Sequence, residues 1–109
     1  MALSGYRVMW LFAMFDLPVD TKDHRREYAQ FRKKLQGAGF TMLQFSVYAK
    51  HLPSEEASES LRAKVRAALP AHGQVRLMAV TDHQFGKMDV FYGRKRTAAE
   101  EPPLQIALF

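Results

Sequence analysis

The sequence predicts an α+β domain in which two helices cover one face of an antiparallel sheet. In several segments apolar residues recur at every second position, which is typical of strands. Between them lie two segments in which apolar residues recur every three or four positions, which is typical of helices. The length of 109 residues suits one domain. Hydrophobic residues make up 48% of the chain, which is enough to form a core. With no internal repeat, residues 1–109 are predicted to form a single domain.

The first predicted strand, residues 6–15, is apolar on both faces. Val8, Trp10, Phe12 and Met14 alternate with Met9, Leu11, Ala13 and Phe15. Pro18 stops this strand, because proline cannot donate to a strand ladder. A helix over residues 21–38 follows, with Asp20 or Thr21 as its N-cap and with Gly37 and Gly39 at its end.

Period-two alternation returns over residues 40–52, which are predicted to form a strand that is bent or broken midway. Pro53 and Ser54 open a second helix with Glu55 and Glu56 at its positive end, and Pro70 closes it. Residues 75–80 are predicted to form a strand, 81–86 a linker and 88–92 a short strand. Residues 1–97 would then form the core of the domain, 98–103 a linker and 104–109 a C-terminal strand.

This order of elements describes a ferredoxin-like βαββαβ sandwich. Two helices cover only one face of such a sheet, whereas strand 6–15 is apolar on both, so the other face needs a cover. A second copy of the chain, packed sheet against sheet about a two-fold axis, provides one. We therefore predict a homodimer in which the C-terminal strand 104–109 adds to the partner's sheet edge.

Composition narrows the classes of function. The absence of cysteine excludes a disulfide scaffold, a cysteine-ligated metal site and a thiol nucleophile. The longest apolar run, Val8–Phe15, is far shorter than the about 20 residues of a spanning helix, so we expect a cytoplasmic protein without a membrane partner. A net charge of +5 and an isoelectric point near 9.7 make a polyanion the expected partner.

Basic residues gather on helix 21–38 and in a second cluster near the C-terminus. The candidate nucleic-acid-binding residues are Lys22, Arg25, Arg26, Arg32, Lys33, Arg94, Lys95 and Arg96. Such a set can follow a phosphate backbone, which arginine contacts through two hydrogen bonds at once. An ordinary solvated helix face explains the first group equally well. The four histidines are far apart in sequence and give no metal-ligand spacing.

Asp16 is the candidate catalytic and metal-binding residue. It ends a strongly apolar strand, where a carboxylate is costly unless it is paired, solvated or bound to a metal. Carboxylate oxygen suits Mg²⁺ or Mn²⁺, which activate water and stabilise charge on a phosphodiester. Alternatively, Asp16 caps the turn before Leu17 and Pro18. One carboxylate per chain makes a poor metal site unless a two-fold axis brings two copies of Asp16 together.

Four segments of the chain stand out together: Met14-Phe15-Asp16-Leu17-Pro18, residues 28–35 (YAQFRKKL), residues 39–48 (GFTMLQFSVY) and residues 80–85 (VTDHQF), followed by Met88 and Tyr92-Gly93. In these segments the chain resembles the small CRISPR-associated endonuclease family, the second of the two universal spacer-acquisition proteins. The resemblance covers nearly the whole chain and is closest to members that accompany Cas9-type systems.

The resemblance implies a ferredoxin-like homodimer whose C-terminal strand joins the partner. It also implies Mg²⁺-dependent cleavage of RNA or DNA, with Asp16 at the position of the metal-binding aspartate. A further implied task is to bridge two dimers of the integrase subunit and to hold a DNA duplex, the prespacer, during spacer insertion. Many members have tyrosine before the aspartate, and Phe15 lacks that hydroxyl.

Two hypotheses of function follow. In the first, the protein is a metal-dependent phosphodiesterase that acts through Asp16. In the second, it is a purely structural DNA-binding adaptor without physiological nuclease activity. A toxin-like ribonuclease of the same fold ranks below both.

Overall fold

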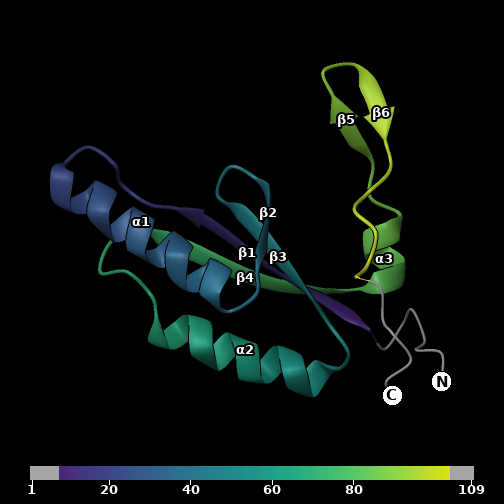
Figure 1. Cartoon of the computed structure of the whole chain (residues 1–109), viewed down its shortest axis with the longest axis horizontal. Coiled ribbons are helices and arrows are strands. Elements are labelled where there is room, and N and C mark those ends of the chain that lie inside the picture. The colour runs from purple at the N-terminus through teal and green to yellow at the C-terminus, as the bar shows by residue number, and fades with distance from the viewer. Residues whose placement is uncertain (1–7, 104–109) are drawn as a thin grey trace.

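The computed structural model describes residues 8–103, which form a four-stranded antiparallel sheet with two long helices on one face (Figure 1). The strand order is β2-β3-β1-β4, and β1 pairs with both β3 and β4. The elements are β1 (Met9–Asp16), α1 (Lys22–Gly37), β2 (Thr41–Gln44), β3 (Val47–Leu52), α2 (Glu55–Ala67) and β4 (Gln74–Thr81). This arrangement confirms the predicted ferredoxin-like sandwich. The predicted C-terminal strand, 104–109, lies outside the described residues.

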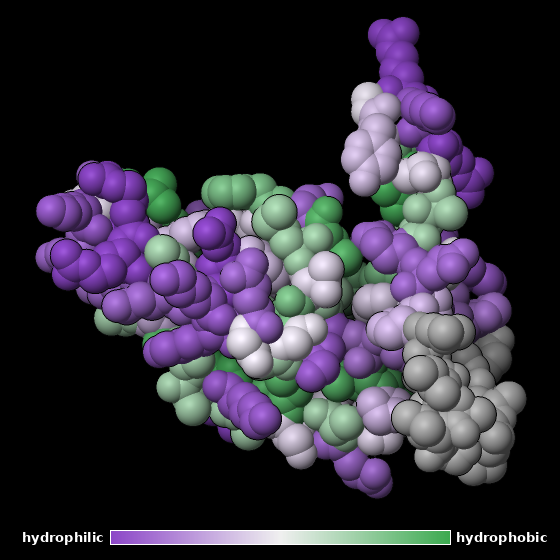
Figure 2. Space-filling view, in the orientation of Figure 1, coloured by the Kyte–Doolittle hydropathy of each residue, from purple (hydrophilic) through white to green (hydrophobic). Residues whose placement is uncertain are grey.

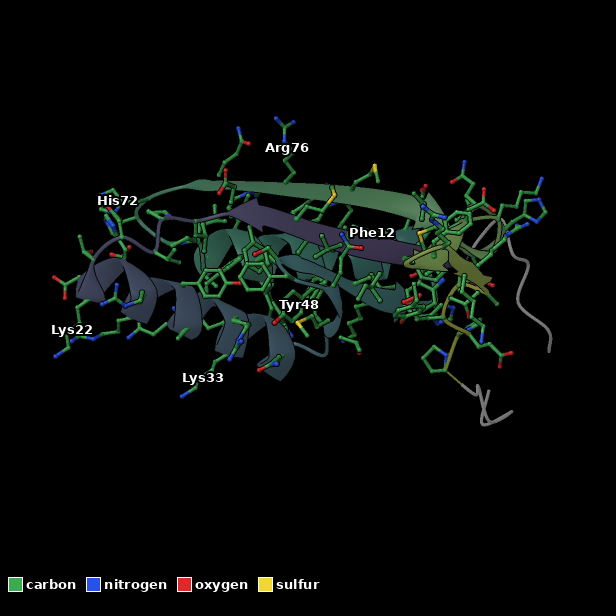
Figure 3. All side chains as sticks on the ribbon, turned by 90° about the horizontal axis from the view of Figure 1, so that it is seen from above. Phe12, Lys22, Lys33, Tyr48, His72 and Arg76 are labelled. Carbon is green, nitrogen blue, oxygen red and sulfur yellow. The ribbon has the colours of Figure 1, made fainter. Side chains whose placement is uncertain are left out.

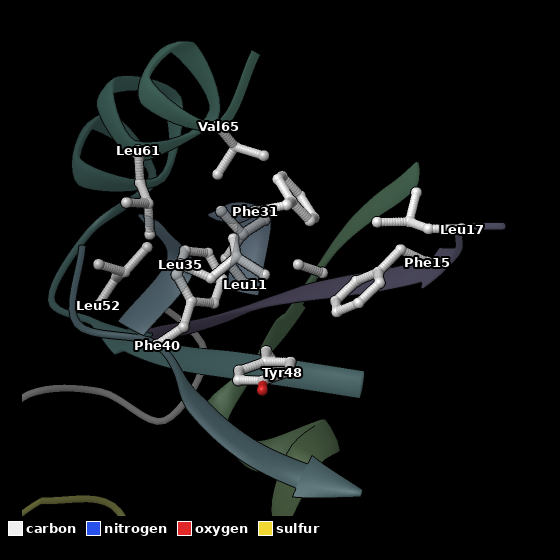
Figure 4. Close-up of a cluster of buried hydrophobic side chains, with 11 residues drawn as sticks. Leu11, Phe15, Leu17, Phe31, Leu35, Phe40, Tyr48, Leu52, Leu61 and Val65 are labelled. Atoms are coloured by element: carbon white, nitrogen blue, oxygen red, sulfur yellow. The ribbon is translucent and has the colours of Figure 1, made fainter. Parts of the chain in front are cut away.

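The core lies between the sheet and the helices. Leu11 and Ala13 of the central strand β1 are fully buried there, and α1 contributes Phe31 and Leu35. Leu61 and Val65 of α2 complete this layer (Figure 4). The side chains at these positions recur at helical spacing on α1 and α2 and at alternate positions on β1. Their pattern in the sequence therefore predicted which face each element buries.

Both long helices begin at side-chain caps. The Thr21 hydroxyl accepts a hydrogen bond from the backbone N–H of His24 at 3.0 Å, and the Ser54 hydroxyl accepts one from Ala57 at 3.1 Å. These bonds satisfy N–H groups that the first turn leaves without partners. Thr21, one of the two predicted caps, is the N-cap of α1.

The predicted break within residues 40–52 is confirmed as the turn between β2 and β3. Ser46 has a φ of 62°, which is uncommon for a residue other than glycine, and the pairing register shifts between Met42 and Gln44. Apolar and polar residues alternate in the sequence on both sides of this turn, so the alternation alone does not mark where β2 ends and β3 begins.

Two predictions in the C-terminal third were wrong. Residues 81–86 are not a linker, because α3 (Asp82–Gly86) begins at a capping box in which Thr81 and Gln84 bond each other's backbone N–H groups. The expected strand 88–92 is shorter, β5 (Val90–Tyr92), and pairs with β6 (Lys95–Thr97). Strand β6 carries no apolar alternation, so its sequence gave no strand signal. The β5–β6 hairpin extends away from the main sheet (Figure 1).

The face of the main sheet opposite α1 and α2, called the helix-free face below because neither long helix lies on it, is apolar and is partly covered by the short helix α3. Trp10 stacks on Phe85 of α3 with ring centroids 3.9 Å apart. Beside this contact lies an open groove of about 530 Å³, whose lining includes Phe12, Met14, Val47, Met78 and Phe91. Met78 and Phe91 are 46% and 58% exposed. Within residues 8–103, no helix has the length and apolar character needed to cross a membrane.

Candidate nucleic-acid and metal site

Asp16 is the last residue of β1 and is exposed. Its register partner is Gln74 of β4, and its side chain alternates with that of Phe15, so it belongs to the same helix-free face as Phe12 and Met14. Among residues 8–103, no hydrogen bond or ion pair to the Asp16 carboxylate is present. The turn-cap interpretation therefore has no support in the structure, and the carboxylate is available to a ligand.

The backbone around Asp16 is held on two sides. The backbone N–H of Phe15 donates to the carbonyl oxygen of Ser46 at 3.1 Å, which ties the end of β1 to the β2–β3 turn. On the other side, Gly73 has a φ of 93°. A Cβ atom at Gly73 would lie 2.7 Å from both the Asp16 carbonyl oxygen and Cδ2 of Leu17. A larger residue at position 73 would therefore displace the strand end that carries Asp16.

Phe15 points away from the carboxylate, into the core. Its ring contacts the rings of Tyr28, Phe31 and Tyr48, with centroids 5.2 to 5.8 Å apart. The Tyr48 hydroxyl is buried without a hydrogen-bond partner. Burial raises the pKa of Tyr48, although the nearby charge of Arg32 acts in the opposite direction. Tyr48 is therefore neutral at physiological pH, and its ring packs against the residue that precedes Asp16.

The described part of the chain holds no group of three or more histidine, aspartate or glutamate side chains that could bind a metal ion. Asp16 is the exposed carboxylate at the end of β1 that could serve as a ligand to a hard cation. His24 and His72, far apart in the sequence, do come together with ring centroids 5.1 Å apart. Each lies beside a carboxylate, Asp20 at 2.6 Å and Glu27 at 3.4 Å.

The structure separates the predicted nucleic-acid-binding residues into two groups, all of them exposed. Lys22, Arg25, Arg26, Arg32 and Lys33 lie on α1. Lys22 and Lys33 extend from the helical layer away from the sheet (Figure 3). Arg94, Lys95 and Arg96 lie in or beside the β5–β6 hairpin, beyond the end of the sheet where β1 begins (Figure 1). Hydrophilic side chains gather over α1 and at the tip of the hairpin, whose lower part also shows hydrophobic residues (Figure 2).

Two of these cations have acidic neighbours. Arg96 lies 2.6 Å from a carboxylate oxygen of Asp89, and Arg26 lies 3.6 Å from one of Asp23. Both pairs are largely exposed, so they are weak and leave the cations available to phosphate. The remaining cations of the two groups have no acidic partner within residues 8–103.

Sequence reasoning missed Arg76. This exposed residue of β4 faces Met14 in the register, two positions from the partner of Asp16. Its side chain leaves the sheet on the side opposite α1 (Figure 3). It is the cation on the same face as Asp16 and close to it in register. The available signal was a charged residue inside an otherwise apolar predicted strand.

Comparisons with the sequences of known proteins identify the family of this chain. The family model described as CRISPR associated protein Cas2 matches residues 9–88. A protein of Parvibaculum lavamentivorans named "CRISPR-associated endoribonuclease Cas2" is 48% identical over 93% of this chain and 100% of its own length. Proteins of the same name from Flavobacterium psychrophilum and Paracidovorax avenae are 42% and 44% identical, each over 98% of this chain and over 93% and 99% of their own lengths. The chain therefore belongs to the Cas2 family of CRISPR-associated proteins.

Proposed function

We propose that this protein is a Mg²⁺-dependent endonuclease of CRISPR adaptation that cleaves phosphodiester bonds of RNA, of DNA or of both. The observation that carries the proposal is the exposed carboxylate of Asp16, which ends a rigid strand and has no partner among residues 8–103. Relatives of nearly full-length similarity are named endoribonucleases, which makes RNA the first substrate to test.

The chemistry required is the attack of water on phosphorus, with loss of the bond to the leaving oxygen. Mg²⁺, or Mn²⁺ in its place, would supply an activated water and stabilise negative charge on the phosphate. Asp16 provides the anionic ligand that such an ion prefers. The exposed cations of α1 would hold neighbouring phosphates of the strand, because opposite charges attract each other.

A homodimer completes this proposal, because one chain supplies a single carboxylate at the site. The helix-free face carries the apolar groove and, at the end of β1, Asp16. A second copy packed on this face about a two-fold axis would remove Met78 and Phe91, which are 46% and 58% exposed, from water and bring the two Asp16 residues toward each other. The half-exposed apolar side chains of the helix-free face support a dimer interface there.

A second candidate function is that of a structural adaptor, which binds the prespacer duplex and bridges two integrase dimers. The eight predicted cations support it, since all of them are exposed and lie outside the four-stranded sheet that carries Asp16. Both functions need nucleic acid as a partner, and both fit a cytoplasmic location. In the adaptor hypothesis, Asp16 has no role in physiological cleavage.

A Mg²⁺ titration of the purified protein, with RNA and duplex DNA of matched length tested in parallel, distinguishes the two proposed functions. A nuclease gives cleavage that increases with Mg²⁺ and is lost on chelation. The adaptor binds the duplex at every Mg²⁺ concentration without cleaving either substrate. The absence of cleavage of both nucleic acids, with binding intact, would overturn the nuclease proposal.

A further inference from the structure

Phe45, at the tip of the β2–β3 turn, is 75% exposed. An aromatic ring that stays in water contributes little to the stability of the fold, because the stabilisation comes from burial of its apolar surface. Its position is nevertheless fixed. The ring stacks on that of Tyr28 of α1, with centroids 5.8 Å apart and an angle of 19° between the ring planes.

The turn that carries Phe45 is braced by the next residue. The carbonyl oxygen of Ser46 accepts a hydrogen bond from Phe15, and the Ser46 hydroxyl lies 3.0 Å from the Tyr28 hydroxyl. Because these bonds hold the backbone, Phe45 would lose little conformational freedom when a ligand binds to it. Such preorganisation is typical of a binding residue.

An aromatic series connects Phe45 to the candidate metal ligand. Phe45 stacks on Tyr28, and Tyr28 contacts Phe15, whose ring centroid lies 5.8 Å away. Phe15 immediately precedes Asp16. The exposed ring is therefore at the same end of the sheet as the carboxylate, and the two are joined by packed side chains and by the Phe15–Ser46 hydrogen bond.

Two cations flank the stacked rings. Arg25 and Arg32 lie three residues before and four residues after Tyr28, so they occupy the same side of α1 about one turn away in each direction. Both are exposed, and Arg25 also donates to the carbonyl oxygen of Val19 at 3.1 Å. Exposed aromatic rings between cations form the usual binding surface for single-stranded nucleic acid, whose bases stack while its phosphates meet positive charge.

We propose that Phe45, backed by Tyr28, is a stacking platform for one unpaired base of a strand whose phosphates contact Arg25 and Arg32. This inference rests on the proposed nucleic-acid function and narrows the substrate to a strand with an unpaired base that reaches Phe45, on the α1 side of the end of the sheet that carries Asp16. A base inside a duplex has no free face to offer, because its neighbours in the stack cover both sides.

Fluorescence anisotropy on the whole chain tests this platform with three probes: a single-stranded oligonucleotide, the same strand with abasic positions throughout, and a blunt duplex. Phe45→Ala should weaken binding of the single strand about five- to 140-fold, which corresponds to the about 1–3 kcal/mol that stacking of one base on an aromatic ring contributes. It should leave the affinities for the abasic strand and the duplex unchanged. Phe45→Trp should restore tight single-strand binding. The matched control is Met42→Ala, which truncates an exposed apolar residue of the same hairpin.

If Phe45→Ala and the unchanged protein bind the single strand with equal affinity, the stacking platform is overturned. The proposed function still stands in that case, because both proteins bind nucleic acid. A changed molecular mass of Phe45→Ala, with unchanged strand affinity, would assign Phe45 to a protein contact instead. If the unchanged protein binds none of the three probes, the proposed function fails together with the platform.

Discussion

The backbone N–H of Phe15 donates a hydrogen bond to the carbonyl oxygen of Ser46, 3.1 Å away. This bond joins the residue before the candidate metal ligand to the turn that carries Phe45. Asp16 is thus positioned by its pairing with Gln74 of β4 and by this hydrogen bond of the preceding residue, and not by a free loop. A ligand on a rigid element keeps its geometry when substrate binds, which a catalytic carboxylate requires.

Gly73→Ala should destabilise the protein and disturb the end of β1. Alanine is strained at a φ of 93°, and its Cβ would lie 2.7 Å from the carbonyl oxygen of Asp16. We expect a loss of about 1–3 kcal/mol in the free energy of unfolding, measured with urea. Gly37→Ala is the matched control, because no atom lies within 4 Å of its added Cβ. Equal stability of the two variants would contradict the role of Gly73.

Acid should destabilise the protein through His51. Its side chain is 5% exposed, its Nε2 atom has no hydrogen-bond partner, and Asp82 lies 3.6 Å away. Burial lowers the pKa of His51 below its ordinary 6.5, with partial opposition from the Asp82 charge. The unfolded chain therefore binds a proton before the folded protein does, so stability is complete above pH 6.5 and is lost as pH falls through the folded pKa.

Unfolding free energies between pH 8 and pH 5 measure this loss. We expect His51→Gln to flatten the decline that begins below about pH 6.5, because it removes the group whose pKa differs between the two states. The control is His83→Gln, which removes an exposed histidine. A decline of the same steepness in His51→Gln and in the unchanged protein would exclude His51 as its source.

Met78→Lys should convert the expected dimer into a monomer without unfolding it. Met78 lines the groove of the helix-free face and is 46% exposed. A charged side chain at this position would therefore be buried in the expected dimer interface but not in the core of the chain. Light scattering should give twice the 12.5 kDa chain mass for the unchanged protein and a lower mass for the variant. Leu69→Lys is the control, since Leu69 is 47% exposed but lies after α2. A monomeric unchanged protein at micromolar concentration would rule out this interface.

Duplex binding should depend on salt through the cations of α1. The logarithm of the affinity falls by about 0.9 per phosphate neutralised for each unit in the logarithm of salt concentration. Replacing Arg25 and Arg26 by alanine should therefore reduce the slope, whereas Lys64→Ala with Arg66→Ala removes two exposed charges from α2 and should not. An unchanged slope in the α1 variant would place the phosphate contacts elsewhere.

Local sequence pattern predicted the parts of this fold that local physics determines. The central strand β1 and the caps at Thr21 and Ser54 belong to this class, because alternation and capping act over a few residues. Strand β6 was missed because its charged residues are held by pairing with β5 and not by an apolar face. The C-terminal strand 104–109 stays a prediction.

The residues of the candidate site likewise fall into those that the sequence pattern predicted and those that it did not. Asp16 was found because a carboxylate at the end of an apolar strand is unusual in any fold. Arg76 and Phe45 were not found, because their significance depends on neighbours that only the sheet register and helix packing provide. The separation of the basic residues between α1 and the hairpin likewise depends on tertiary structure.

The most direct test of the central claim is the initial rate of Mg²⁺-dependent RNA cleavage by Asp16→Asn, compared with the unchanged protein. The amide keeps the shape of the side chain but lacks the charge that the cation requires. We expect the rate to fall by orders of magnitude while the unfolding free energy, the molecular mass and the affinity for duplex stay unchanged. Cleavage by Asp16→Asn at the rate of the unchanged protein would contradict the assignment of Asp16 as the metal ligand.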